Sequence, residues 1–162
     1  MKSFLVILSL LVFQMTVRAE TAPGDIVGTL ERESVLRRWN AVAVLPAGLK
    51  RSMAKLFKEP SLELAEPGVV LSDTFEIEKN GKRPPDKRLI FAFETSSFYV
   101  VYVEYGPPAV HCAILVFERG RVPSPNFVWG GTDLQPARQT SPSRLVNLLS
   151  KGSFTYEPGV IW

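Results

Sequence analysis

The feature that most limits the fold of this chain is a set of three apolar segments separated by turns of only three residues. The segments cover residues 88–94, 98–105 and 109–118, and aromatic and β-branched residues dominate all of them. The turns, 95–97 and 106–108, are built from serine, threonine, glycine and proline. Because connections this short join only antiparallel strands, the sequence predicts an antiparallel meander.

Both faces of this meander are apolar. Pairing Glu94 with Phe98, and Tyr105 with Ala109, sets a register that can be tested. One face then carries Ile90, Ala92, Phe98, Val100, Tyr102, Cys112, Ile114 and Val116. The other carries Leu89, Phe91, Phe93, Tyr99, Val101, Val103, His111, Ala113, Leu115 and Phe117. We therefore expect both faces to be covered, by helices, by a bent strand or by a partner.

The segments before the meander predict two helices and one further strand. Apolar residues at spacings of four and three predict a helix over residues 30–43, although residues 39–45 could also form a strand. A second helix is expected from Pro46 to about Lys58. Residues 69–78 alternate between apolar or acidic and polar side chains, which predicts a half-exposed strand.

The segments after the meander predict a fifth strand and a last helix. The strand is expected over Asn126–Trp129, and the helix has Ser141 as its N-cap, Pro142 as its first residue and Gly152 as its stop. The ending, residues 153–162, could add a strand. The predicted fold class is α+β: N-terminal helices, then a 4–5 stranded antiparallel meander, with a C-terminal helix packed on the sheet.

The N-terminus has the pattern of a secretory signal peptide over residues 1–19. Lys2 precedes residues 4–13, a run that is apolar except for Ser9, and Ala19 is the small residue at the expected cleavage point. The run is too short to span a bilayer, so we expect no stable membrane anchor after cleavage. Residues 20–28 are expected to be a flexible lead-in, and 29–162 a single α+β domain.

Charge and cysteine content indicate which partners and which compartment suit the mature protein. The precursor has 19 basic and 16 acidic residues, and loss of Lys2 and Arg18 leaves 17 against 16, a net charge of +1. A nearly neutral domain is not suited to nucleic-acid binding. Cys112 is the single cysteine, so no disulfide can form within the chain. Small secreted eukaryotic domains usually have paired cysteines, so we expect a periplasmic or extracellular location in a bacterium.

The sequence contains no arrangement that indicates catalysis. His111 and Cys112 are adjacent in a predicted strand, so their side chains point to opposite faces and cannot form a dyad. Zinc sites usually use several histidine and cysteine ligands, and this sequence has one of each, so we expect no zinc site. No cofactor motif is present. The remaining candidates are carboxylates, which we expect to be ordinary solvated charges: Asp73, Glu76, Glu94 and Glu104. We predict no catalytic, cofactor or metal residue.

A basic loop is the most distinctive surface feature in the sequence, either as a solubilising loop or as a surface for contacts with a partner. Its members are Lys79, Lys82, Arg83, Lys87 and Arg88.

The leading hypothesis is an exported, non-catalytic binding domain that acts on another protein in a bacterial envelope, such as an inhibitor or immunity protein. One alternative is a carrier of a small apolar ligand between sheet and helices, which requires a closed pocket. Another is a carboxylate enzyme, which requires two convergent carboxylates in a cleft.

Overall fold

The computed structural model describes residues 20–71, 85–106, 111–120, 123–133 and 141–156. The helices are α1 (Gly24–Arg32), α2 (Ala47–Leu56) and α3 (Pro142–Ser150). The strands are β1 (Glu20–Thr21), β2 (Arg37–Trp39), β3 (Lys87–Glu94), β4 (Phe98–Tyr105), β5 (His111–Glu118), β6 (Asn126–Asp133) and β7 (Thr155–Tyr156). The strands form one antiparallel sheet in the order β1-β7-β6-β5-β4-β3-β2.

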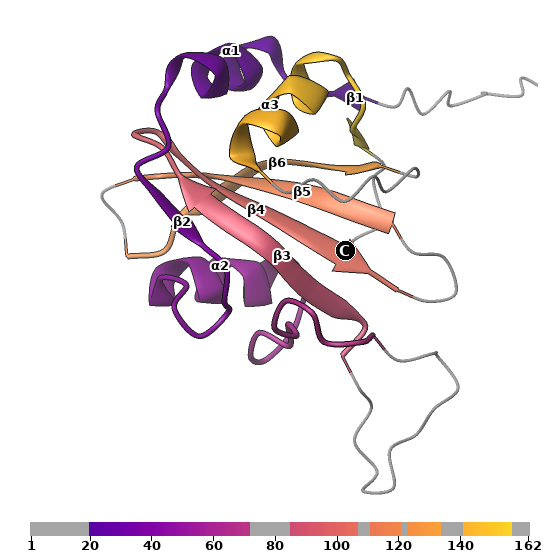
Figure 1. The fold of residues 1–162 in the computed structure, drawn as a ribbon. Helices are drawn as coiled ribbons and strands as arrows, with labels where there is room; N and C mark the ends of the chain where they lie inside the picture. Colours follow the sequence, from indigo (N-terminus) through magenta and orange to yellow (C-terminus); the bar gives the residue numbers. More distant parts are fainter. Residues whose placement is uncertain (1–19, 72–84, 107–110, 121–122, 134–140, 157–162) are drawn as a thin grey trace, which may run out of the picture.

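Three layers make up the molecule, with the sheet in the middle. Helices α1 and α3 lie on one face of the sheet and α2 lies on the other (Figure 1). The four strands of eight residues, β3 to β6, are consecutive in the chain and adjacent in the sheet, so they form a meander. The predicted combination of helices with an antiparallel sheet is therefore confirmed.

Each face of the sheet has its own apolar core. On the first face, Ile26 and Leu30 of α1 and Leu145 and Leu149 of α3 pack against the strands. On the second face, Leu49 and Met53 of α2 do the same. The strand residues of the first core are Phe91, Phe93, Val100, Tyr102, Cys112, Ile114, Val116 and Trp129. Those of the second are Trp39, Leu89, Ala92, Val101, Val103, Ala113, Leu115 and Phe117. The expectation of two covered faces is met by helices.

The predicted register is correct for the faces of β4 and β5 but wrong for much of β3. Glu94 pairs with Tyr99 rather than Phe98, a slip of one residue that moves Phe91, Phe93 and Ala92 to the opposite face. A bulge between Leu89 and Phe91 absorbs one residue, so Leu89 stays on the predicted face. Between β4 and β5 the error is two residues, which preserves the faces.

The prediction of a helix over residues 30–43 is wrong. Helix α1 ends at Arg32, Glu33 is extended, and Trp39 pairs with Ala92 as part of β2. Residues 37–39 pair with the edge of β3 as a strand instead of continuing the helix. A short apolar run fits both the helical and the strand pattern, so its spacing does not distinguish them. Residues 20–28, expected to be flexible, instead contribute β1 and the start of α1.

The other two predicted helices agree with the structure, and the described part of the predicted strand over residues 69–78 does not. Helix α2 begins directly after Pro46, and α3 begins after Ser141, whose hydroxyl accepts a hydrogen bond from the Arg144 amide at 3.4 Å. Gly152 has a φ of +67°, which suits the residue that ends a helix. In the expected strand 69–78, residues 69–71 form no strand, and 72–78 lie outside the described residues.

Candidate functional site

Strand β2 forms one end of the described sheet, and the two residues just before it present apolar side chains to solvent. It pairs with β3 on one side, and no described strand pairs with its other side. Val35 and Leu36, just before it, are 44% and 57% exposed. We call Val35–Trp39 the β2 edge. A strand edge beside exposed apolar side chains is a surface to which another extended chain can pair.

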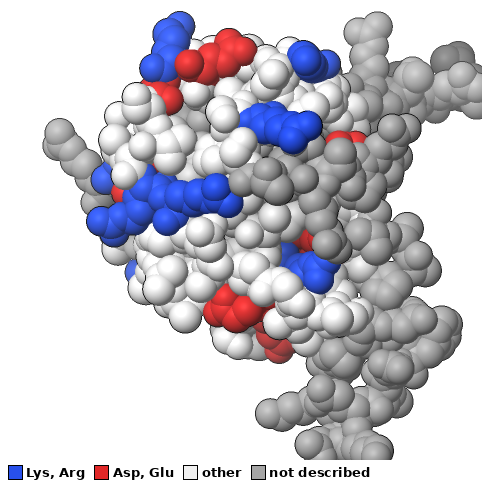
Figure 2. Space-filling view, viewed as in Figure 1, with Lys and Arg blue, Asp and Glu red and all other residues white. Residues whose placement is uncertain are grey.

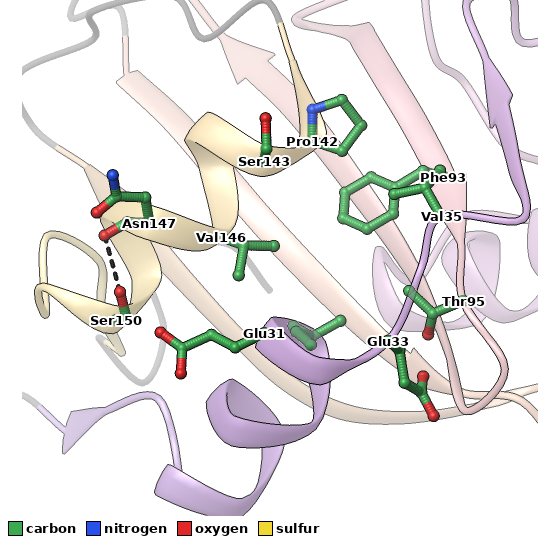
Figure 3. A pocket seen from close by; sticks show the side chains of 11 residues that line it. Glu31, Glu33, Val35, Phe93, Thr95, Pro142, Ser143, Val146, Asn147 and Ser150 are labelled. Atoms are coloured by element: carbon green, nitrogen blue, oxygen red, sulfur yellow. Dashed lines mark hydrogen bonds between the residues drawn. The ribbon is translucent and has the colours of Figure 1, made fainter.

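A cleft of about 450 Å³ lies beside this edge, between α1 and α3 (Figure 3). Val35 belongs to both, so the β2 edge and the cleft form one continuous surface. Its lining residues are Leu30, Glu31, Glu33, Val35, Phe93, Thr95, Pro142, Ser143, Val146, Asn147 and Ser150. We call this the α1–α3 cleft.

The lining of the α1–α3 cleft divides into an apolar part and a polar wall. Leu30 from α1, Phe93 from β3 and Val146 from α3 provide apolar surface. Ser143, Asn147 and Ser150 provide the hydroxyl and amide groups on the α3 side, where the Ser150 hydroxyl donates to the Asn147 carbonyl at 3.0 Å (Figure 3). The charged residues of the lining are Glu31 and Glu33. The cleft therefore offers apolar contact with a net negative charge.

Glu33 is held in place by the turn between β3 and β4. One carboxylate oxygen accepts from the Ser97 amide at 3.0 Å, and the other accepts from the Ser97 hydroxyl at 2.6 Å. Burial acts to raise the pKa of Glu33, but the hydrogen bonds from Ser97 and Thr95 outweigh it, so the pKa lies below its usual value. Glu33 is therefore an ionised anchor between α1 and the sheet.

Glu31 differs from Glu33 because its side chain is exposed. The Glu31 carboxylate forms no hydrogen bond or ion pair with the described part of the chain. Figure 3 shows the two carboxylates pointing away from one another, with that of Glu31 toward the Asn147 and Ser150 side of the cleft. Since a carboxylate acid–base pair must converge on one substrate, this arrangement does not support the carboxylate-enzyme alternative.

The contrast between these two glutamates gives a prediction. We expect Glu33→Gln to lower the free energy of unfolding by about 1 kcal/mol at pH 7, since one amide cannot accept both bonds from Ser97. A lowered folded-state pKa gives stability that is present above the unfolded value of 4.5 and lost as pH falls through the folded value. Urea unfolding at pH 7 and pH 3 should therefore show the difference from wild type shrinking at pH 3. Glu31→Gln is the matched control and should change little; equal effects of the two would contradict the assignment.

Comparison with known proteins returned nothing similar. No family model matches the chain, and neither a curated protein nor a solved structure matches it. None of the described helices is long and apolar enough to cross a membrane. Within the same residues, no group of three or more His, Cys, Asp or Glu side chains could hold a metal ion.

The predicted partner-contact residues do not form one exposed surface in the described part of the chain. The Nζ of Lys87 lies 2.6 Å from Glu59 and 3.1 Å from Asp86. Burial acts to lower the pKa of Lys87, but the bonds to Glu59 and Asp86 outweigh it and raise the pKa. Arg88 forms an ion pair with Glu104. Both cations serve the fold, while Lys79, Lys82 and Arg83 lie outside the described residues.

The carboxylates singled out in the sequence are not all solvated charges. The Glu104 side chain is only 3% exposed, and its Oε1 lies 2.5 Å from Arg88 Nη2. The Glu94 side chain is 13% exposed and lies 4.0 Å from Arg37. Asp73 and Glu76 lie outside the described residues. The interpretation as ordinary surface charges is therefore wrong for Glu104, because its partner Arg88 allows it to be buried.

His111 and Cys112 lie on opposite faces of the sheet, as strand alternation predicts. Cys112 is fully buried in the first core. The His111 ring stacks on Tyr105, which belongs to the second core, with ring centres 5.2 Å apart and planes at 4°. Burial is the main reason that the pKa of Tyr105 lies far above its ordinary value. The geometry gives these residues a packing role and does not bring thiol and imidazole together.

Sequence reasoning missed the α1–α3 cleft and the β2 edge. The cleft joins α1 and α3, which are more than 100 residues apart in the chain. The prediction of one helix over residues 30–43 also hid the edge strand inside a helix. One signal was available: Val35 and Leu36 are adjacent apolar residues next to Arg37 and Arg38, a sequence unsuited to full burial.

Proposed function

We propose that this chain is an exported, non-catalytic binding domain that recognises another protein in a bacterial cell envelope. Its binding surface is the β2 edge with the α1–α3 cleft beside it. The partner supplies an extended segment that pairs with β2 as an additional strand. The signal-peptide pattern over residues 1–19 supports export, and the single cysteine is compatible with an envelope location.

The observation that carries the proposal is the exposure of Val35 and Leu36 directly before the edge strand β2. Exposed apolar residues are common singly, but here two are adjacent, next to a strand edge and a cleft. The basic residues Arg37 and Arg38 argue against pairing of β2 with β2 of a second copy, because an antiparallel pair would place like charges close together. Figure 2 shows the basic side chains as a stripe over β2, with acidic side chains over α1 above it. A different chain is thus the better partner.

The filled interior favours protein binding over the carriage of an apolar ligand. Leu49 and Met53 under the sheet, and Leu145 above it, are completely buried among strand residues. Dense packing of this kind leaves no room for a ligand at these positions. The α1–α3 cleft is a surface feature, and it suits one inserted side chain of a larger partner.

Substitutions at the β2 edge test the proposal. The protein is immobilised and used to capture envelope proteins, which are identified by mass spectrometry. We expect Leu36→Lys to lower partner capture at least tenfold, because it removes central apolar contact and adds charge to a desolvated surface. Val70→Lys is the matched control: Val70 is 85% exposed, lies outside the β2 edge, and undergoes the same chemical change. If both variants capture the partner as well as the wild type, the β2 edge is not the binding surface.

A further inference from the structure

The α1–α3 cleft has a chemistry that selects one kind of side chain. We infer that it receives a lysine or arginine side chain from the partner's extended segment. This inference rests on the proposed function and adds to it the chemical class of the partner. The inference follows from the acidic residues of the lining, from its apolar residues and from the position of the cleft beside β2.

The first step is the charge of the cleft. The charged lining residues are both acidic, and they are placed differently: Glu33 is fixed by Ser97, while Glu31 has no described partner. Figure 3 shows the carboxylate of Glu31 on the side of the cleft where Asn147 and Ser150 of α3 lie. A cation at this position would gain an ion pair with Glu31, and the Asn147 and Ser150 side chains provide additional oxygen acceptors.

The second step is the apolar surface. Leu30, Phe93 and Val146 line the same cleft as the two carboxylates. A lysine or arginine buries its aliphatic stem on apolar surface and keeps its charged head near water or an acidic group. A purely apolar side chain would leave Glu31 without a partner, and an acidic one would be repelled. The lining therefore favours the two long basic side chains.

The third step is geometry. A strand added to β2 presents alternate side chains to the two faces of the sheet. One set of these points to the face covered by α1 and α3, which is where the cleft opens next to Val35. Arg38 of β2 does not line the cleft: its guanidinium lies 4.6 Å from the centre of the Phe91 ring and donates to Asn40. It leaves the cleft free for a cation from the partner.

Small probes test the cleft without any knowledge of the partner. We expect n-hexylamine, titrated into ¹⁵N-labelled protein, to give saturable chemical-shift changes at residues that line the cleft, with a Kd of about 1–10 mM, the range for so few atoms. The uncharged n-hexanol should bind about twofold to fivefold more weakly, which is the strength of an exposed ion pair. The anion n-hexanoate should bind more weakly still. Shifts elsewhere only, or equal affinity for all three probes, would overturn the inference.

Two variants test which residues give the cleft its preference for the amine. Glu31→Gln should reduce the affinity for n-hexylamine to that for n-hexanol, and because the Glu31 side chain is exposed and has no ion pair with the described residues, the fold should be retained. Asn147→Lys places an ammonium group at the cleft and should prevent binding of n-hexylamine, since the site is then occupied by a built-in cation. Unchanged preference for the amine in Glu31→Gln would contradict the role given to this carboxylate.

The outcomes separate this inference from the proposed function. If n-hexylamine binds in the cleft but Leu36→Lys leaves partner capture unchanged, the cleft selects cations and the β2 edge is not a protein-binding surface. If capture depends on Leu36 but the probes do not bind, the edge is the binding surface and the cleft does not select a basic side chain.

Discussion

Arg88→Met should lower the free energy of unfolding by about 3–5 kcal/mol, which is the largest effect that we expect from a single substitution. Arg88 and Glu104 face each other across β3 and β4, with side chains 12% and 3% exposed. Arg88 also donates through Nη1 to the Val69 carbonyl at 2.6 Å. Methionine retains the apolar stem but removes the ion pair between Arg88 and the buried Glu104 carboxylate together with the bond to Val69, and the loss of these two interactions accounts for the effect.

A double variant distinguishes the value of the ion pair from the cost of breaking it. We expect Arg88→Met combined with Glu104→Leu to recover much of the stability, because a buried pair replaced by apolar side chains is often neutral. Arg37→Met is the matched control. Its side chain is 68% exposed and lies 4.0 Å from Glu94, so the loss should stay below about 1 kcal/mol. Denaturant unfolding measures all of these, and a double variant that is no more stable than Arg88→Met would contradict the interpretation.

The central strands could be predicted because their signal is local. Residues 98–105 form β4 with the predicted bounds, and β5 ends at Glu118 as predicted, while 109–110 lie outside the described residues. Alternating aromatic and β-branched residues between short turns leave few other arrangements. Helix α3 was also predictable, since Ser141, Pro142 and Gly152 are local signals at its two ends.

The features that set the candidate site depend on contacts between distant residues. The pairing of Glu94 with Tyr99 instead of Phe98 decides which face Phe93 takes, and no turn residue marks this shift of one position. Phe93 consequently reaches the α1–α3 cleft, on the face opposite to the one predicted. Burial of Glu104 depends on Arg88, 16 residues earlier, and on pairing in the correct register. Composition and periodicity do not contain this information.

The basic loop illustrates the difference between a sequence cluster and a surface. Lys87 and Arg88 were grouped with three other cations because they are close in sequence. In the structure Lys87 lies 5.0 Å from the centre of the Phe57 ring and pairs with Glu59, while Arg88 pairs with Glu104. Glu59 and Glu104 thus pair with these two cations within the fold, which their spacing in the sequence did not indicate.

The second large effect is expected at Gly48, where Gly48→Ala should lower the free energy of unfolding by about 1–3 kcal/mol. Gly48 is in the first turn of α2, and a Cβ there would overlap the carbonyl oxygen of Pro123. The segment 123–125 cannot easily move away, because Pro123 accepts from Arg51 at 3.0 Å and Pro125 accepts from Ser52 at 2.6 Å. Alanine would therefore separate α2 from the chain that enters β6.

The sign of this effect makes it a sharp test, since alanine normally stabilises a helix relative to glycine by about 1 kcal/mol. Gly28→Ala in α1 is the matched control, because nothing lies within 4 Å of the position that its Cβ would take. We expect Gly28→Ala to raise the free energy of unfolding by about 0.5–1 kcal/mol and Gly48→Ala to lower it. Urea unfolding of the two variants measures both. Stabilisation by Gly48→Ala would show that α2 does not pack closely on Pro123, and would place the second core in doubt.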